Sequence, residues 1–202
     1  MKASVVRRMC AVIGVSVGLY GCSSTLKPAE LNDEGRFETG SVVTSADQTI
    51  NAPYSAERYG KMIVVFTFTE NKTVNEFFFQ SIKNSKKFEQ VYDEDELEKF
   101  VIKNQIPDVT DASSLLSMNK LAKSVGPFLV VKPYVEWKGG YDYIASVEVI
   151  DAQTTETVFT AQKKAFNWAG LDKPLLYPLM NAFIDWTEGK EPPPPPPPRK
   201  KK

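Results

Sequence analysis

The chain has 202 residues, with 25 acidic and 25 basic side chains and no histidine. Without histidine, Ser-His-Asp and Cys-His catalysis are excluded, and the commonest metal ligand of proteins is missing. The zero net charge gives no sign of a nucleic-acid groove, and we expect no metal or other cofactor.

Residues 1–21 have the pattern of a secretory signal peptide. Three basic residues precede an uncharged, mostly apolar run at 9–20. As a helix this run would span about 18 Å, which is too short to cross a hydrocarbon core of about 30 Å. One interpretation is an ordinary secretory signal, in which Cys22 after the run has no special role. The alternative is a lipoprotein signal, which residues 19–22 favour.

Residues 19–22 read Leu-Tyr-Gly-Cys and resemble the lipobox of bacterial lipoproteins. The resemblance implies cleavage before Cys22 and acylation of both its thiol (diacylglycerol) and its new amine, giving palmitate-type chains that anchor the protein stably. The other cysteine, Cys10, would leave with the signal, so the mature chain would have no free thiol. In sorted lipoproteins an Asp after the cysteine is the retention signal, so Ser23 implies the outer membrane, facing the periplasm.

Residues 22–58 are polar and contain few aromatic side chains. We predict a flexible tether with at most a short strand near 41–44. Its root-mean-square reach would be about 30–35 Å.

Residues 59–188 are predicted to form one α+β domain, a mixed sheet of about five strands packed by three to four helices. The expected order is strand, helix, strand, helix, helix, three strands and a helix. Strands are predicted at 62–69, 88–92, 128–137, 141–151 and 157–166. Helices are predicted to begin at Thr73 and Asp93 and to cover 112–125 and 174–186.

Several local signals shape this prediction. The continuous apolar run 62–69 is typical of a strand buried on both faces. Thr73 and Asp93 each precede a Glu by three residues, as in a capping box. The acidic run that begins at Asp93 lacks the glycine and ligand spacing of a calcium loop, so we interpret it as a helix start.

Two prolines and a glycine pair also predict local features of the strands, a turn and the last helix. Pro133 cannot donate a backbone hydrogen bond, so its strand is predicted to be an edge strand or to carry a bulge. Gly139 and Gly140 predict a tight turn. Pro178 is predicted to bend the last helix.

Four segments resemble a known group of envelope proteins: 61–69, 87–91, 121–131 and 147–158. The relatives are the curli-secretion channel (CsgG) family, the LpoB-like activators of penicillin-binding proteins, and the N-terminal domain of TolB. The resemblance covers roughly 60–165 and implies a shared fold more than a shared function. It departs from the family at Thr155, where the hairpin glycine is expected, and at Lys132-Pro133. The loops leave no room for the long hairpins of a membrane pore, so we expect none.

Residues 189–202 are predicted to form an extended tail. Seven prolines at 192–198 would make a polyproline II rod of about 22 Å. The last four residues are basic: Arg199, Lys200, Lys201 and Lys202. These charges could contact peptidoglycan or anionic lipid. The alternative is a solvated tail without a specific target.

Three functions are compatible with these features. The first is a non-enzymatic outer-membrane lipoprotein that binds and assists an envelope protein, with activation of a cell-wall synthase as one form. The second is a subunit of a secretion or surface-appendage assembly. The third is a carboxylate-based glycan hydrolase using Asp142, Glu148 or Asp151, although a solvated sheet face explains these residues more simply.

The predicted turn at 139–140 is flanked by Trp137, Tyr141 and Tyr143. Aromatic side chains at a loop tip can anchor a protein partner. Core packing or cross-strand pairing is the alternative interpretation. We expect this tip to be the first candidate for partner binding.

Overall fold

The computed structural model describes residues 30–67, 71–166 and 170–197. Cys22, the signal peptide and the four basic residues at 199–202 lie outside these ranges. Six strands form one sheet: β1 (Gln48–Ile50), β2 (Met62–Val65), β3 (Gln90–Tyr92), β4 (Leu129–Gly139), β5 (Asp142–Asp151) and β6 (Thr157–Phe166). The helical segments are α1 (Ala56–Tyr59), α2 (Lys72–Asn84), α3 (Glu94–Lys103), α4 (Leu115–Val125), a short π-helix η1 (Asp172–Leu176) and α5 (Tyr177–Thr187).

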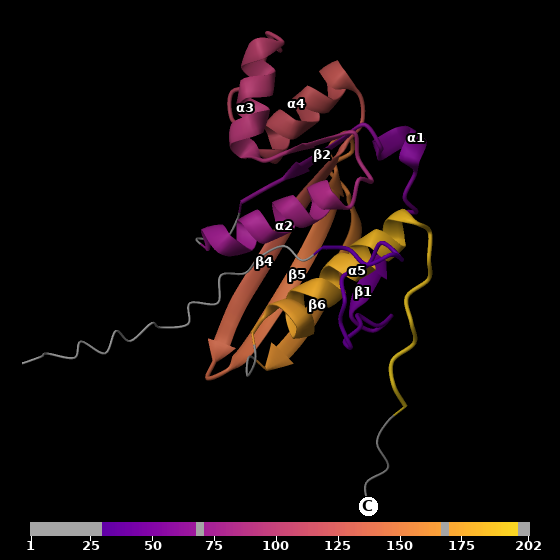
Figure 1. The fold of residues 1–202 in the computed structure, drawn as a ribbon. Helices are drawn as coiled ribbons and strands as arrows, with labels where there is room; N and C mark the ends of the chain where they lie inside the picture. Colours follow the sequence, from indigo (N-terminus) through magenta and orange to yellow (C-terminus); the bar gives the residue numbers. More distant parts are fainter. Residues whose placement is uncertain (1–29, 68–70, 167–169, 198–202) are drawn as a thin grey trace, which may run out of the picture.

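The sheet is mixed, in the order β1-β6-β5-β4-β2-β3 (Figure 1). β2 runs parallel to β3 and β4, and the other neighbours are antiparallel. The predicted α+β class is therefore confirmed, with the five predicted strands present and β1 added at the edge.

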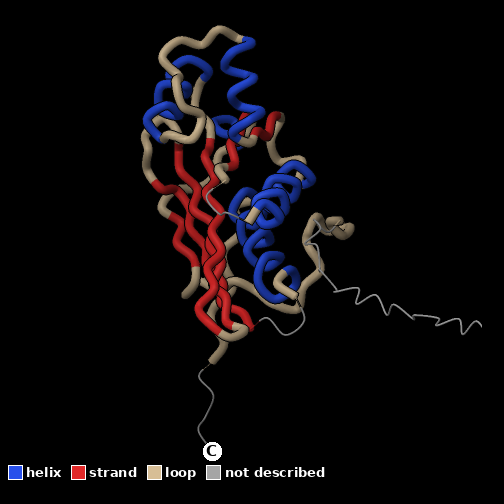
Figure 2. Tube along the Cα trace, turned by 90° about the vertical axis from the view of Figure 1, so that its left-hand side faces the viewer, coloured by secondary structure: helices blue, strands red, loops and turns tan. Residues whose placement is uncertain are grey.

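Helices cover the two faces of the sheet unequally. Helices α2 and α5 pack on one face, where Ile63 and Val65 of β2 join the larger core. Helices α3 and α4 pack on the other face with Met62 and Val64, but only at one end of the sheet. Figure 2 shows that the lower part of this second face carries no helix among the described residues. β2 is buried on both faces, as its apolar run predicted.

Pro133 lies in β4, which is an interior strand for only part of its length. β2 pairs with β4 over residues 129–131, and β5 pairs with β4 along its other side. Beyond residue 131 no described strand lies on the β2 side. Pro133 thus sits where β4 is an edge strand, as predicted, and its missing N–H breaks no ladder bond there. The register shift in β4 comes later, between Trp137 and Gly139.

Two helix starts differ from the prediction. Helix α2 is capped by Asn71, whose Oδ1 accepts the amides of Thr73 and Val74 at 3.1 and 3.3 Å, and not by Thr73. The last helix, predicted at 174–186, consists of the π-helix η1 followed directly by α5, and Pro178 lies in the first turn of α5, where a missing N–H is tolerated. Asp93 caps α3 as predicted, accepting the amide of Glu96 at 2.7 Å.

The segment 30–47, here called the N-terminal arm, packs against the domain. Phe37 is 1 % exposed and its ring lies 5.4 Å from that of Tyr177. Its backbone N–H donates to Asn181 Oδ1 at 2.8 Å, and its carbonyl accepts from Asn181 Nδ2 at 2.9 Å. Val43 is buried as well. Over its described part, the segment predicted as a flexible tether is therefore held in place, and its strand is β1 rather than 41–44.

Charged groups reinforce the arm. Arg36 Nη2 lies 2.5 Å from both Asp185 Oδ1 and Glu188 Oε2 on α5. Glu188 also pairs with Lys87 and Lys190. The hydrogen bond from Arg36, opposed by burial and aided by the two lysines, holds the pKa of Glu188 far below its ordinary value. The group is therefore a fixed anion at the point where arm and helix meet.

The start of the C-terminal tail meets the same arm. The amide of Ser45 donates to the carbonyl of Pro193 at 2.8 Å. Trp186, at the end of α5, donates its indole N–H to the carbonyl of Ala52 at 3.0 Å. The proline segment thus leaves the domain beside the N-terminal arm. No helix in the described ranges is long and apolar enough to span a membrane.

Replacing Phe37 with Ala tests the docking of the arm. Because the ring is fully buried, Phe37→Ala should lower the free energy of unfolding by about 3–4 kcal/mol in urea titrations. Val42→Ala is the matched control, since Val42 is 55 % exposed, and should cost less than about 0.5 kcal/mol. Equal effects of the two substitutions would contradict a docked arm.

Thr155 offers a test of backbone strain. It has a φ of 63° in the β5–β6 turn, a conformation that costs a β-branched residue about 1–2 kcal/mol. Thr155→Gly should raise the free energy of unfolding by about 0.5–1 kcal/mol after allowing for the greater freedom of unfolded glycine. The neighbouring Thr154→Gly should lower it by a similar amount; a loss in both variants would contradict the strain.

Candidate binding surface

The β4–β5 hairpin projects at the end of the sheet away from α3 and α4 (Figure 1). Its turn contains Gly139 and Gly140, whose φ values are 108° and 59°. Residues with side chains rarely adopt these values, so the glycine pair is required for the turn. The long pairing of β4 with β5 and of β5 with β6 makes a rigid platform for the residues around it.

Three exposed aromatic side chains surround this turn and are here called the aromatic tip: Trp137, Tyr141 and Phe166. Trp137 is 63 % exposed, and its indole N–H donates to the carbonyl of Gly140 at 3.0 Å, which fixes the ring across the turn. The rings of Tyr141 and Phe166, each 54 % exposed, have centroids 5.3 Å apart.

Tyr143 differs from the other two residues predicted for this site. It is half-buried and packs against the larger core cluster, so its ring supports the hairpin more than it presents a surface. Phe166 was not predicted, because its position at the last residue of β6 marked it only as a strand end. In the pairing of β5 with β6, Phe166 lies opposite Asp142, the first residue of β5, and this places its ring at the tip.

The tip also carries charge and an open cavity. Lys138 pairs with Glu136 at 2.5 Å. A cavity of about 450 Å³ opens beside the turn, and its lining includes Lys138, Ile144, Lys164 and Phe166. The surface thus combines exposed aromatic rings with charged groups of both signs, and the aromatic rings are the component typical of protein-binding hot spots.

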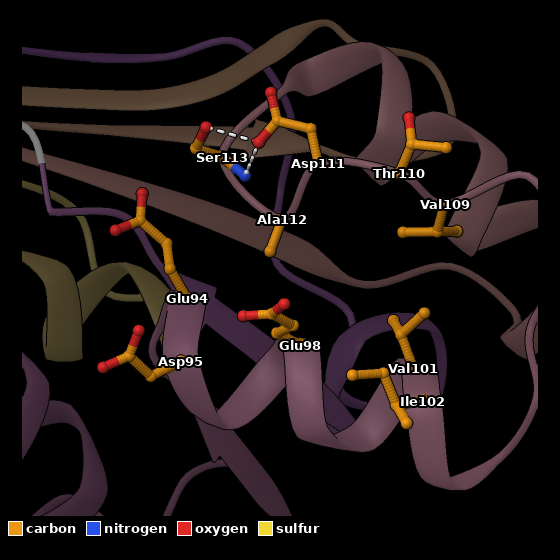
Figure 3. Close-up of a pocket in the computed structure, with 10 residues that line it drawn as sticks. All are labelled: Glu94, Asp95, Glu98, Val101, Ile102, Val109, Thr110, Asp111, Ala112 and Ser113. Carbon is orange, nitrogen blue, oxygen red and sulfur yellow. Dashed lines mark hydrogen bonds between the residues drawn. The ribbon is translucent and has the colours of Figure 1, made fainter.

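A second hollow lies between α3 and the loop before α4 (Figure 3). It has a volume of about 380 Å³ and four acidic residues: Glu94, Asp95, Glu98 and Asp111. Asp111 accepts the amide and the hydroxyl of Ser113, and these bonds lower the pKa of its carboxyl group. In the described ranges no group of three or more Asp, Glu, His or Cys side chains is arranged to hold a metal ion.

The three carboxylates considered for catalysis do not form a pair. Asp142 and Asp151 lie at opposite ends of β5, nine residues or about 30 Å apart, whereas glycosidase carboxylates lie about 5–10 Å apart. Glu148 accepts the hydroxyl of Thr157 at 2.7 Å. Glu148 and Asp151 are three positions apart on β5, so their side chains lie on opposite faces of the sheet.

Asp151 is a buried structural anchor at the β5–β6 turn. Its Oδ2 accepts from Tyr59 at 2.8 Å and from Arg58 at 2.7 Å, while its Oδ1 accepts the amides of Gln153 and Thr154. Burial opposes its charge, but these hydrogen bonds outweigh burial and lower its pKa. Asp151 therefore ties α1 to the turn.

Comparison with known proteins gives only distant likenesses. No family model matches the chain, and no curated protein does. Among solved structures, the LpoB C-terminal domain from Salmonella enterica is 13 % identical, over 54 % of this chain and 84 % of that one, with a TM-score of 0.36. A PelC dodecamer from Paraburkholderia phytofirmans is 15 % identical, over 69 % and 94 %, with a TM-score of 0.40. The lipoprotein GNA1162 from Neisseria meningitidis is 16 % identical, over 62 % and 94 %, with a TM-score of 0.39. No functional conclusion follows from similarity at this level.

The protonation of Asp151 can be tested through stability. A carboxylate whose pKa is lowered by folding stabilises the protein above its unfolded pKa of about 4, and this contribution is lost as the pH falls through the folded pKa. Asp151→Asn should therefore cost about 2 kcal/mol at pH 7 and clearly less at pH 2–3, measured by urea unfolding. A cost that is the same at both pH values would contradict this role. The exposed Asp142→Asn is the control and should change stability by less than about 0.5 kcal/mol.

Proposed function

We propose that this chain is a lipid-anchored protein of the bacterial envelope that binds another envelope protein and catalyses no reaction. The anchor is Cys22, whose lipobox-like context supports acylation. Ser23, in place of the retention residue Asp, supports placement in the outer membrane with the domain in the periplasm. The sequence resemblance to LpoB-like activators supports assistance to a cell-wall synthase as one specific form of this function.

The aromatic tip is the observation that carries the binding role. Trp137 keeps most of its surface exposed although it is held rigidly by its bond to Gly140. A pre-ordered Trp loses little conformational freedom on binding, and Trp and Tyr are the commonest hot-spot residues. The basic tail at 199–202 supplies a second, electrostatic contact with anionic lipid or peptidoglycan.

A subunit of a secretion or surface-appendage assembly is the second candidate. It is favoured by β4, which beyond residue 131 has no described strand on its β2 side. An edge strand of this kind can pair with another copy of the chain. The mass of the detergent-extracted, cross-linked protein separates the candidates: a closed ring supports the assembly, and a strict monomer contradicts it.

A photo-crosslinking residue at position 141 tests the binding role in intact envelopes. We expect one reproducible adduct, identified by mass spectrometry. The same residue at position 102 is the control, because Ile102 is more exposed than Tyr141 but lies on α3, at the other end of the sheet. The same adducts at both positions, or none at 141, would contradict the proposal.

Trp137→Ala should weaken binding to the captured partner by about thirtyfold or more, the effect of a hot spot worth about 2 kcal/mol. The free energy of unfolding should change by less than about 0.5 kcal/mol, since the ring lies outside the core. Titration of the purified partner and thermal melts measure the two quantities. Ile102→Ala is the matched control and should leave the partner affinity unchanged.

A further inference from the structure

The edge of β4 that faces away from β5 has no neighbouring strand near the aromatic tip, as far as the chain is described (Figure 1). β2 pairs with β4 only up to Val131, whose carbonyl accepts the amide of Phe66 at 2.8 Å. Beyond Val131, residues 30–67, 71–166 and 170–197 place no strand on this side. On its other side β4 pairs with β5 as far as the turn. The strand is therefore held in place while this edge can accept another strand.

The backbone groups on this edge belong to alternate residues. The N–H and C=O of one residue point to the same side of a strand, and successive residues point to opposite sides. Because the Val131 carbonyl faces β2, the groups of Pro133, Val135 and Trp137 face the same edge. Pro133 has only a carbonyl to offer, whereas Val135 and Trp137 each have a donor and an acceptor. Such groups, spaced along an edge, fit another extended chain.

We propose that a second copy of this chain pairs with this edge, antiparallel, about a two-fold axis at Glu136. Val135 then lies opposite Trp137 of the second copy, and Trp137 lies opposite Val135 of the second copy. The two residues of each pair exchange both of their N–H···O bonds, so the donors of Val135 and Trp137 are all used. The inference goes beyond the proposed function, because it needs neither the lipid anchor nor the partner of the aromatic tip.

The structure of the chain selects this register. Moving the axis to Val135 would bring Gly139 of the second copy opposite Val131, where β2 already lies. Moving the axis to Trp137 would bring Gly139 of the second copy opposite Val135, and the φ of Gly139, 108°, is not that of a strand. The axis at Glu136 keeps both pairs within the regular part of β4.

The side chains of the paired residues are both apolar. Val135 is half-buried and packs against the larger core with one side. Trp137 is 63 % exposed. A β-branched residue opposite an aromatic residue is a favourable cross-strand pair. The pairing therefore removes apolar surface of both residues from water.

The charges on the opposite face also match. Glu136 would lie opposite Glu136 of the second copy, which alone would be unfavourable. However, Lys138 Nζ lies 2.5 Å from Glu136 Oε1 in the same chain. In the dimer Lys138 also becomes the diagonal neighbour of Glu136 of the second copy, within reach of a long side chain. Each copy thus brings one carboxylate and one ammonium group to the axis, and their charges cancel.

This contact uses the same surface on both copies. An isologous contact of this kind closes with two copies, so it gives a dimer and no ring by itself. Phe166 lies on β6, which β5 and β4 separate from the edge, and the ring of Tyr141 packs against it. Both rings therefore remain available to another protein in the dimer.

A photo-crosslinking residue in place of Tyr134 tests the pairing in intact envelopes. Tyr134 is 47 % exposed and would lie opposite Lys138 of the second copy, so we expect an adduct of two chains linked at or next to residue 138. Gln162 is the matched control, because the register places it in one row with Ser146 and Tyr134, on the same face. Position 162 should give no chain-to-chain adduct. A link from 134 to a distant part of the second copy, or none, would overturn the inference.

Val135→Pro removes the central N–H from the edge of each copy. Proline is tolerated on an edge strand, so the fold should be kept. The dissociation constant of the dimer, measured by sedimentation of the detergent-extracted full chain, should rise about tenfold or more. Val135→Thr is the control, since it keeps the N–H and a β-branched side chain, and should stay within about threefold of the wild type. Equal constants for Val135→Pro and the wild type would overturn the pairing.

Amide exchange of the wild-type chain decides the question if Val135→Pro does not fold. The amides of Val135 and Trp137 should be protected at high protein concentration and exchange faster on dilution. The amide of Tyr134 faces β5 and should stay protected at both concentrations. Exchange of the Val135 amide at the rate of an unstructured peptide at every concentration would overturn the dimer.

The outcomes separate this inference from the proposed function. A strict monomer overturns the dimer but leaves the binding of an envelope protein by the aromatic tip standing. Absence of the residue-141 adduct, together with a 134–138 link between two chains, overturns the binding role of the tip and supports the dimer.

Discussion

The burial of Phe37 between α2 and α5 is the contact on which the arrangement of both chain ends depends. Its ring lies 6.3 Å from Phe77 on α2 and 5.4 Å from Tyr177 on α5. Asn181 satisfies the Phe37 backbone, so an otherwise extended polar segment can lie against apolar surface without unpaired groups. The docked arm then delivers β1 to the sheet edge and Ser45 to Pro193.

Unequal coverage of the sheet explains where the candidate surface lies. β4, β5 and β6 have ten or eleven residues each, whereas β2 and β3 have four and three. Helices α3 and α4 cover only the end shared with the short strands. The long strands extend past this cover, and their far end presents the aromatic tip. An antiparallel sheet tolerates one solvated face, so this exposure needs no compensating layer.

The sequence predicted most of the sheet because its strands carry strong local signals. The apolar run of β2, the alternation of β5 and the glycine pair of the hairpin each determine one structure, and Pro133 marked the free part of β4. The arm was not predictable in this way. Its composition is polar, and a single buried ring, Phe37, supplies much of its docking. Phe37 docks against Asn181, which is far away in the sequence, so no local pattern predicts the contact.

The candidate site was predicted in part for similar reasons. Trp137 and Tyr141 flank the turn in sequence, so their place at the tip follows from the hairpin alone. Phe166 arrives there through the register of β6, which no local pattern gives. Tyr143 was predicted at the tip because it lies close to the turn in sequence, yet it packs against the larger core.

Amide hydrogen exchange of Phe37 in the acylated protein tests the central claim most directly. Its N–H is bonded to Asn181 and lies on a buried residue, so the account predicts protection close to that of the β5 core, at Val147 for example. Exchange of the Phe37 amide at the rate of an unstructured peptide, with Val147 still protected, would contradict a docked arm.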